Sequence, residues 1–161
     1  LDVASRIGAE GLGNHDIMLA FEAPERGRLV SKRLGTARFA LFSAAGEKVP
    51  AFWIGLTGEY DRYRPMRLGF SHFAMPPRLR VPEFHHIHAA MRQTGLPGPL
   101  PLRLGANDRT LARIPDAEIV ELEYWMIYHE SRREDPMLRL VIDWLSEAAQ
   151  QAEAATAAVA G

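Results

Sequence analysis

Residues 16–43 limit the possible folds more than any other part of this 161-residue chain. They contain two short, continuous apolar runs, at 17–21 and 39–42, and each run is too short for a buried helix. A turn at 23–27 with proline and glycine, and an alternating segment at 29–34, lie between the two runs. Short apolar runs between turn signals are typical of strands buried on both faces of an α/β sheet. The alternating segment fits a strand or connector with one face in water.

Further strands are predicted by the apolar runs at 51–56, 73–81, 96–102, 111–115 and 119–129. The run at 73–81 contains Pro76 and Pro77, and the run at 96–102 contains three prolines. Because proline cannot donate to a strand ladder, we expect both runs to be edge strands or irregular. The segment 57–70 mixes arginines with tyrosines, and a surface helix or loop is favoured there over a base-stacking surface.

Three helices are expected. The first, at 4–14, is weak because it contains three glycines. The second spans 84–93, with an apolar face and a C-terminal cap at Gly95. The third begins with Asp135 as N-cap and Pro136 at the first helical position. Its apolar stripe comprises Leu138, Val141, Ile142, Leu145 and Ala149, and its alanine-rich end is predicted to fray.

Several of these segments together resemble the effector-binding domain of LysR-type transcriptional regulators. The resemblance begins with the Asp16-led apolar strand, the acidic turn with proline, Leu-Val-x-x-x-Leu-Gly at 29–35 and Phe-Ala-Leu-Phe at 39–42. It continues through Trp-Ile-Gly at 53–55, Leu-Ala-Arg-Ile-Pro at 111–115, Trp-x-x-x-His at 125–129, an Arg-Arg turn and Val-Ile-Asp-Trp-Leu at 141–145. The resemblance covers nearly the whole chain, although the prolines at 97–101 depart from the family pattern.

Strands that alternate with helices predict an α/β fold with a mostly parallel sheet. The resemblance implies two Rossmann-like lobes joined by crossover strands, as in periplasmic binding proteins of type II. Lobe one is expected at 1–36 and 115–151, lobe two at 37–114, and a frayed tail at 152–161. The family also carries a winged helix-turn-helix, a linker helix and a first βα unit upstream. We therefore expect this chain to be a fragment with an incomplete first lobe, poorly soluble by itself because apolar sheet surface is uncovered.

The resemblance also implies where a small-molecule effector binds. Open α/β sheets place ligands at the carboxyl ends of strands, against helix N-termini. Two such places are expected: Phe21 and Glu22 after the first strand, and Glu83, Phe84 and His85 at the start of the helix at 84–93. The helix N-terminus suits an anion, and the two phenylalanines favour an aromatic ligand. The alternative is that both phenylalanines are ordinary core residues.

Motifs for catalysis are weak. His85, His86 and His88 form a histidine-rich turn, with His72 upstream, but no H-E-x-x-H is present. The sequence contains no G-x-S-x-G, G-x-G-x-x-G or P-loop. Glu22 and Glu25 fit an exposed acidic turn better than a catalytic pair. We therefore expect no catalytic residue, metal or cofactor.

The formal net charge of −1 gives no basic surface for nucleic acid, and the chain has no cysteine. The predicted function is effector sensing for a LysR-type regulator in the cytoplasm, with DNA bound only through the family's N-terminal domain. Predicted partners are a small-molecule effector and further copies of the chain, through the effector domains, and no membrane. The alternatives are a free-standing solute-binding protein and, less favoured, a metal-dependent enzyme that uses the three histidines at 85, 86 and 88.

Overall fold

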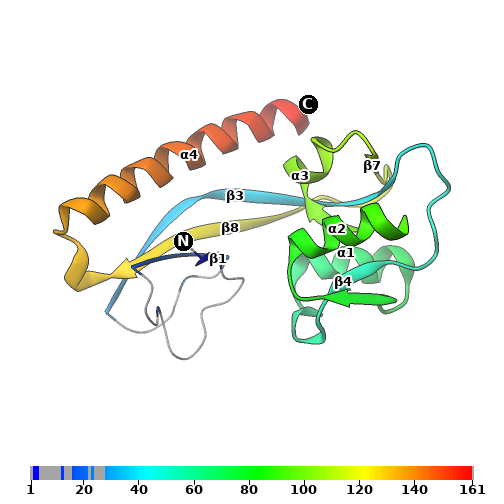
Figure 1. The fold of residues 1–161 in the computed structure, drawn as a ribbon, viewed down its shortest axis with the longest axis horizontal. Coiled ribbons are helices and arrows are strands. Elements are labelled where there is room, and N and C mark those ends of the chain that lie inside the picture. The colour runs from blue at the N-terminus through cyan, green and yellow to red at the C-terminus, as the bar shows by residue number, and fades with distance from the viewer. Residues whose placement is uncertain (1, 4–11, 13–15, 22, 24–27, 161) are drawn as a thin grey trace. The chain divides into compact units, whose positions relative to one another are not determined.

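A computed structural model describes residues 2–3, 12, 16–21, 23 and 28–160 (Figure 1). The chain divides into two compact units, unit 1 with residues 1–37 and 122–161, and unit 2 with residues 38–121. Two strands, β3 (Leu29–Ala44) and β8 (Val120–His129), contribute residues to both units. Whether the units act as the two predicted lobes stays a prediction.

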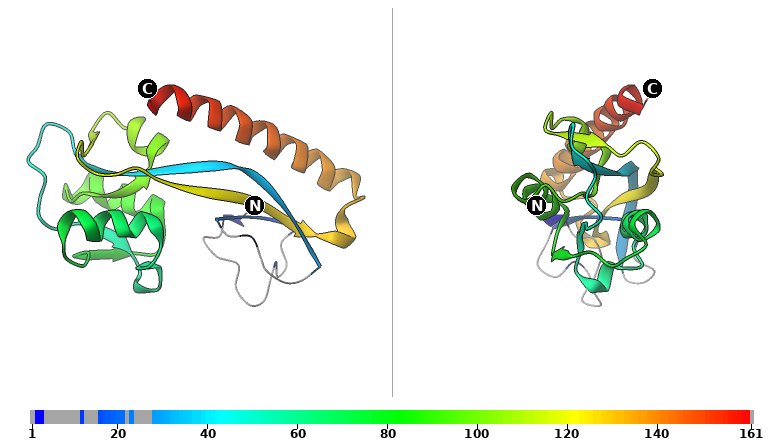
Figure 2. Two further views of the ribbon diagram at one scale, coloured as in Figure 1. Left: turned by 180° about the vertical axis from the view of Figure 1, so that it is seen from behind. Right: turned by 90° about the vertical axis from the view of Figure 1, so that its right-hand side faces the viewer.

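Unit 1 combines several strands with one long helix. Strand β1 (Asp2–Val3) pairs in parallel with β2 (Ile17–Ala20), and β2 pairs antiparallel with β8. A 3-10 turn, η2 (Glu130–Arg132), leads from β8 into helix α4 (Pro136–Ala160). Figure 2 shows α4 lying along the parts of β3 and β8 that belong to unit 1, and its buried face packs on Ile17, Met126 and Tyr128.

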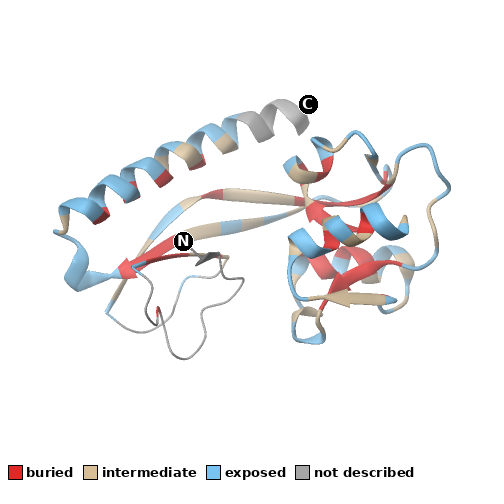
Figure 3. Ribbon diagram, in the orientation of Figure 1, coloured by how far each residue is buried: buried red, intermediate tan, exposed pale blue. Residues whose placement is uncertain are grey.

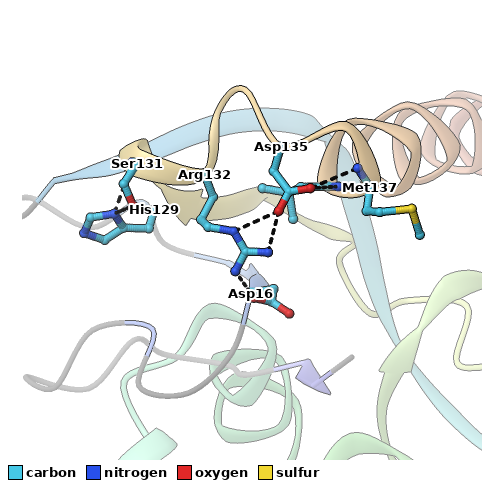
Figure 4. Close-up of polar contacts among 7 residues, drawn as sticks. Asp16, His129, Ser131, Arg132, Asp135 and Met137 are labelled. Atoms are coloured by element: carbon cyan, nitrogen blue, oxygen red, sulfur yellow. Dashed lines mark hydrogen bonds and ion pairs between the residues drawn. The ribbon is translucent and has the colours of Figure 1, made fainter.

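Helix α4 begins as the sequence predicts. The Asp135 carboxylate accepts hydrogen bonds from the backbone N–H groups of Met137 (3.0 Å) and Leu138 (3.3 Å), which confirms Asp135 as the N-cap (Figure 4). The four buried residues of the predicted stripe are Leu138, Ile142, Leu145 and Ala149 (Figure 3). Val141 is wrongly placed in that stripe, because it lies one helical step from the buried face and is 40% exposed. The helix includes the alanine-rich segment up to Ala160, where the sequence predicts fraying.

Unit 2 contains a second, two-stranded sheet, in which β4 (Ile54–Leu56) and β5 (Leu79–Val81) are parallel. The C-terminal half of β3 pairs antiparallel with β6 (Gly98–Pro101) and β7 (Leu111–Arg113). The helical elements of unit 2 are η1 (Gly58–Tyr60), α1 (Arg64–Phe73), α2 (Phe84–Thr94) and α3 (Leu102–Ala106). Among the described residues, no helix combines the length and apolar character that a membrane span requires.

The core of unit 2 is organised around Trp53. Its ring is fully buried, and its indole N–H donates a 2.9 Å hydrogen bond to the Met75 carbonyl. The ring of Phe70 lies edge-on to it, with centroids 5.3 Å apart, and Phe73 stacks at 6.0 Å. Gly69 lies so close that an added Cβ would stand 2.3 Å from a Trp53 ring carbon. Trp53 is therefore a core residue, held by packing on all sides.

Three expectations about secondary structure need correction. The larger sheet is not mostly parallel: within the described residues β2–β8, β3–β6 and β3–β7 are antiparallel and β1–β2 is parallel, while the parallel pair β4–β5 forms a separate sheet. The predicted strand at 73–81 is reduced to β5, since α1 extends to Phe73 and Pro76 and Pro77 supply no N–H donors. The segments at 29–34 and 39–42 form the single strand β3.

Other predictions are confirmed. Helix α2 spans Phe84–Thr94, and Gly95 follows it in the left-handed conformation with φ of 70°. The proline-containing strand β6 is the last strand in the order β1-β2-β8-β3-β6 of the described sheet. It is therefore an edge strand, as predicted. The helix expected at 4–14 falls outside the described residues.

Candidate functional site

The first turn of α2 follows directly from strand β5. Glu83 is the N-cap, with extended backbone angles of φ −143° and ψ 159°. Its carbonyl accepts hydrogen bonds from the N–H groups of His86 (3.1 Å) and Ile87 (3.2 Å). Ile87 is fully buried in the core of unit 2 and anchors this turn. The turn therefore holds residues 83–86 at a fixed position on the surface of unit 2.

Two of the predicted effector contacts face solvent here and one is turned inward. A carboxylate oxygen of Glu83 lies 3.1 Å from His85 Nδ1, and the two side chains are 61% and 66% exposed. Phe84 is half-buried against the core, with its ring centroid 5.0 Å from that of Phe39 and 6.4 Å from that of Tyr63. The structure thus brings together Glu83, Phe84 and His85, and Phe84 also serves as packing.

The other two predicted contacts belong to unit 1. Phe21 follows β2 directly and is half-buried. Glu22 lies outside the described residues, as does Glu25. A role for Phe21 and Glu22 in effector binding stays a prediction.

Thr57 is a candidate site residue to which no motif in the sequence points. It follows β4, and its N–H donates a 3.1 Å hydrogen bond to the carbonyl of Val81 at the end of β5. Its hydroxyl is buried and has no hydrogen-bond partner within the described part of the chain. Burying a polar group without a partner costs about 1–3 kcal/mol. A hydroxyl at the carboxyl ends of two parallel strands lies where α/β sheets bind ligands, and the signal in the sequence is a threonine directly after an apolar run.

Arg80 fixes the loop that carries Thr57. Its guanidinium contacts both carboxylate oxygens of Asp61, at 2.7 and 3.1 Å, and also donates to the Leu56 carbonyl at 2.9 Å. Such a two-pronged contact is directional as well as charged. It therefore holds η1 against the ends of β4 and β5.

The predicted histidine cluster is divided between two places. His88 Nε2 lies 2.8 Å from an Asp108 carboxylate oxygen, and His88 is not part of the group of ligand atoms from Glu83, His85 and His86. The ring of His86 instead lies 3.9 Å from that of His85, between centroids. The first turns of α2 thus contribute to two polar clusters. One contains Glu83, His85 and His86, and the other joins His88 to Asp108.

No protein-family model matches the sequence, and no curated protein sequence matches it significantly. In three dimensions, the chain matches the regulatory domains of LysR-type transcriptional regulators over about 85% of its length, in a region without a DNA-binding domain. This match confirms the predicted α/β class, and the fold is the mixed α/β fold of those regulatory domains.

Three solved structures illustrate the similarity. The regulatory domain of CrgA, a LysR-type regulator from Neisseria meningitidis, is 17% identical with a TM-score of 0.70, and the match covers 87% of this chain and 80% of that one. The effector domain of AmpR from Pseudomonas aeruginosa is 18% identical with a TM-score of 0.64, over 88% and 75%. Full-length LysG from Corynebacterium glutamicum with bound effector Arg is 17% identical with a TM-score of 0.59, over 85% of this chain and 52% of LysG.

Proposed function

We propose that the chain is the small-molecule effector-sensing domain of a LysR-type DNA-binding transcriptional regulator. The observation that carries this proposal is the match to regulatory domains over 87% and 88% of the chain in CrgA and AmpR. The solved LysG structure contains a bound effector, arginine. By analogy, this chain binds a small metabolite and transmits its presence to DNA-binding domains. A regulator of this kind works on DNA, so the proposal places the protein in the cytoplasm.

The start of α2 is the proposed effector contact in unit 2. The N–H groups of Phe84 and His85 belong to the first helical turn, which lacks intrahelical acceptors, and the helix dipole is positive there. Both features favour a carboxylate or another anion. We propose the Thr57 hydroxyl as a further polar contact and the half-buried ring of Phe84 as an apolar one. Phe21 and Glu22 are proposed as contacts in unit 1.

The proposed role is binding without catalysis or DNA contact by this chain. The matched structures are regulatory domains of transcription factors. The formal net charge of −1 gives no electrostatic attraction to a phosphate backbone. DNA recognition is accordingly assigned to a separate domain of the regulator.

Helix α4 has an exposed apolar face, which fits the self-association expected of such a regulator. Four apolar side chains of α4 are exposed: Met137 (71%), Leu140 (65%), Val141 (40%) and Trp144 (62%). Their spacing of i, i+3, i+4 and i+7 puts them on one face of the helix, and we call these four residues the α4 stripe. Contiguous exposed apolar surface of this kind marks interaction sites, and we propose that a second copy of the chain covers it.

Thermal unfolding with a panel of metabolites tests the effector proposal. The panel contains arginine, aromatic carboxylates and aliphatic carboxylates, with neutral analogues of each. A ligand that binds the folded state raises the Tm as its concentration exceeds its Kd. We expect an anionic compound to raise the Tm, and we expect Thr57→Val to weaken its binding while Ser71→Ala, at an exposed position on α1, does not. A panel without any binder, or binding that is equal in Thr57→Val and wild type, would contradict the proposal.

A further inference from the structure

We propose that Glu83, His85 and His86 form a binding site for a divalent transition-metal ion such as Zn²⁺. Each residue offers one ligand atom, and the three atoms all lie within 4.8 Å of one another. This set differs from the histidines that the sequence suggests, because Glu83 takes the place of His88. The proposal goes beyond effector sensing and does not depend on it.

The local backbone explains how neighbouring residues converge. Successive side chains on a regular helix point about 100° apart, since 3.6 residues complete one turn. Glu83, however, precedes the helix and has an extended backbone. Its carboxylate lies within 3.1 Å of His85 Nδ1, two residues further along the chain. The rings of His85 and His86 lie 3.9 Å apart between centroids, at an interplanar angle of 40°. Three donors therefore gather around one point although they come from four consecutive positions.

The donors indicate the class of ion. Two imidazole nitrogens with one carboxylate oxygen suit Zn²⁺, Co²⁺, Ni²⁺ or Cu²⁺, whereas Mg²⁺ and Ca²⁺ prefer oxygen ligands only. Three protein ligands leave the fourth position of a tetrahedral ion open to water or to another small ligand. The site as assembled therefore has the composition of an open zinc site.

Two opposing electrostatic effects set the strength of the site. The positive end of the α2 dipole disfavours a cation. The Glu83 carboxylate offsets this effect, and the ion can reach the site from solvent because Glu83 and His85 are 61% and 66% exposed. His88 contributes nothing here, because it is bonded to Asp108. We expect reversible binding, weaker than at a buried structural site with four protein ligands.

Calorimetric titration of the chain with ZnCl₂ in a non-coordinating buffer tests the site. We expect one ion per chain, and we expect His85→Ala and His86→Ala each to weaken the Kd by about tenfold or more, since even outer-shell partners of metal ligands contribute 10- to 100-fold. Glu83→Gln keeps the shape and removes the charge, and it also weakens the Kd. His72→Ala is the matched control, because His72 is an exposed helical histidine outside the cluster.

Circular dichroism of each variant establishes that it is folded, and His85→Gln and His86→Gln replace any alanine variant that is not. The proposal is overturned if wild type shows no saturable binding of one ion. It is also overturned if the His85 and His86 variants bind Zn²⁺ as wild type does, if His72→Ala weakens binding equally, or if Mg²⁺ binds as tightly as Zn²⁺.

Discussion

His88 and Asp108 are joined by a 2.8 Å hydrogen bond that connects α2 to the turn before β7. The other carboxylate oxygen of Asp108 accepts from the Thr110 hydroxyl at 2.6 Å and from the Thr110 N–H at 2.9 Å. The Asp108 side chain is 12% exposed and that of His88 is 22% exposed. The hydrogen bonds from Thr110, followed by that from His88, lower the pKa of Asp108 from 3.8 to about 2.

This contact predicts a pH dependence of stability in acid. A carboxyl group whose pKa is lower in the folded state stabilises the fold above its unfolded pKa and loses that contribution as the pH falls through the folded value. For Asp108 the contribution is present above about pH 4 and is lost towards pH 2. Urea unfolding of Asp108→Asn and wild type should therefore differ most near neutral pH, and the difference should shrink between pH 4 and 2.

Asp116→Asn is the control for this experiment, because Asp116 is exposed in the loop after β7. We expect its difference from wild type to stay small throughout the range. If the Asp108→Asn difference is the same at pH 6 and at pH 2, the carboxylate of Asp108 does not stabilise the fold as described.

The close approach of Gly69 to Trp53 predicts a packing effect. A Cβ at position 69 would stand 2.3 to 2.5 Å from three ring carbons of Trp53, and that ring is fully buried and hydrogen-bonded. Because the ring cannot move without disturbing the core of unit 2, we expect Gly69→Ala to destabilise the fold by about 1–3 kcal/mol. Gly58→Ala is the control, since a Cβ at position 58 meets no atom within 4 Å. Equal unfolding midpoints in urea for the two variants would refute this.

The α4 stripe predicts a change of oligomeric state. Leu140 and Trp144 are 65% and 62% exposed, so the double variant Leu140→Glu/Trp144→Glu should leave the fold of unit 1 intact while placing charge on the proposed contact. We expect wild type to associate in sedimentation velocity and the double variant to sediment as a smaller species. Gln150→Glu adds charge at an exposed position of α4 outside the stripe and should behave as wild type. Identical sedimentation of wild type and the double variant would argue that α4 is not the association surface.

Local signals in the sequence predict the elements well. Asp135 and Gly95 mark helix ends because capping depends on the residue and its immediate neighbours. Apolar runs likewise identify β2 and β8. The direction of strand pairing is not local, which explains why a mostly parallel sheet is predicted and antiparallel pairs are found.

The candidate site shows the same limit. The sequence places Glu83, Phe84 and His85 at a helix start, and the structure confirms this placement. It cannot show that His88 contacts Asp108, twenty residues away along the chain, or that the Thr57 hydroxyl is buried beside the end of β5. Both depend on how distant segments pack, and residue spacing carries no information on that packing.

The N-cap of α4 offers a test of the helix on which the proposed association surface lies. Asp135 caps the helix through Met137 and Leu138, and it also accepts from Arg132 at 2.7 and 3.1 Å (Figure 4). The hydrogen bonds from Arg132 are the largest cause of a lowered pKa for Asp135. Asparagine caps helices about as well as aspartate, whereas alanine does not. We therefore expect the Tm to fall in the order wild type, Asp135→Asn, Asp135→Ala, with the first step due to the Arg132 contact and the second to the cap. Thermal unfolding by circular dichroism measures both steps. If Asp135→Ala and Asp135→Asn had the same Tm, the cap would not stabilise α4.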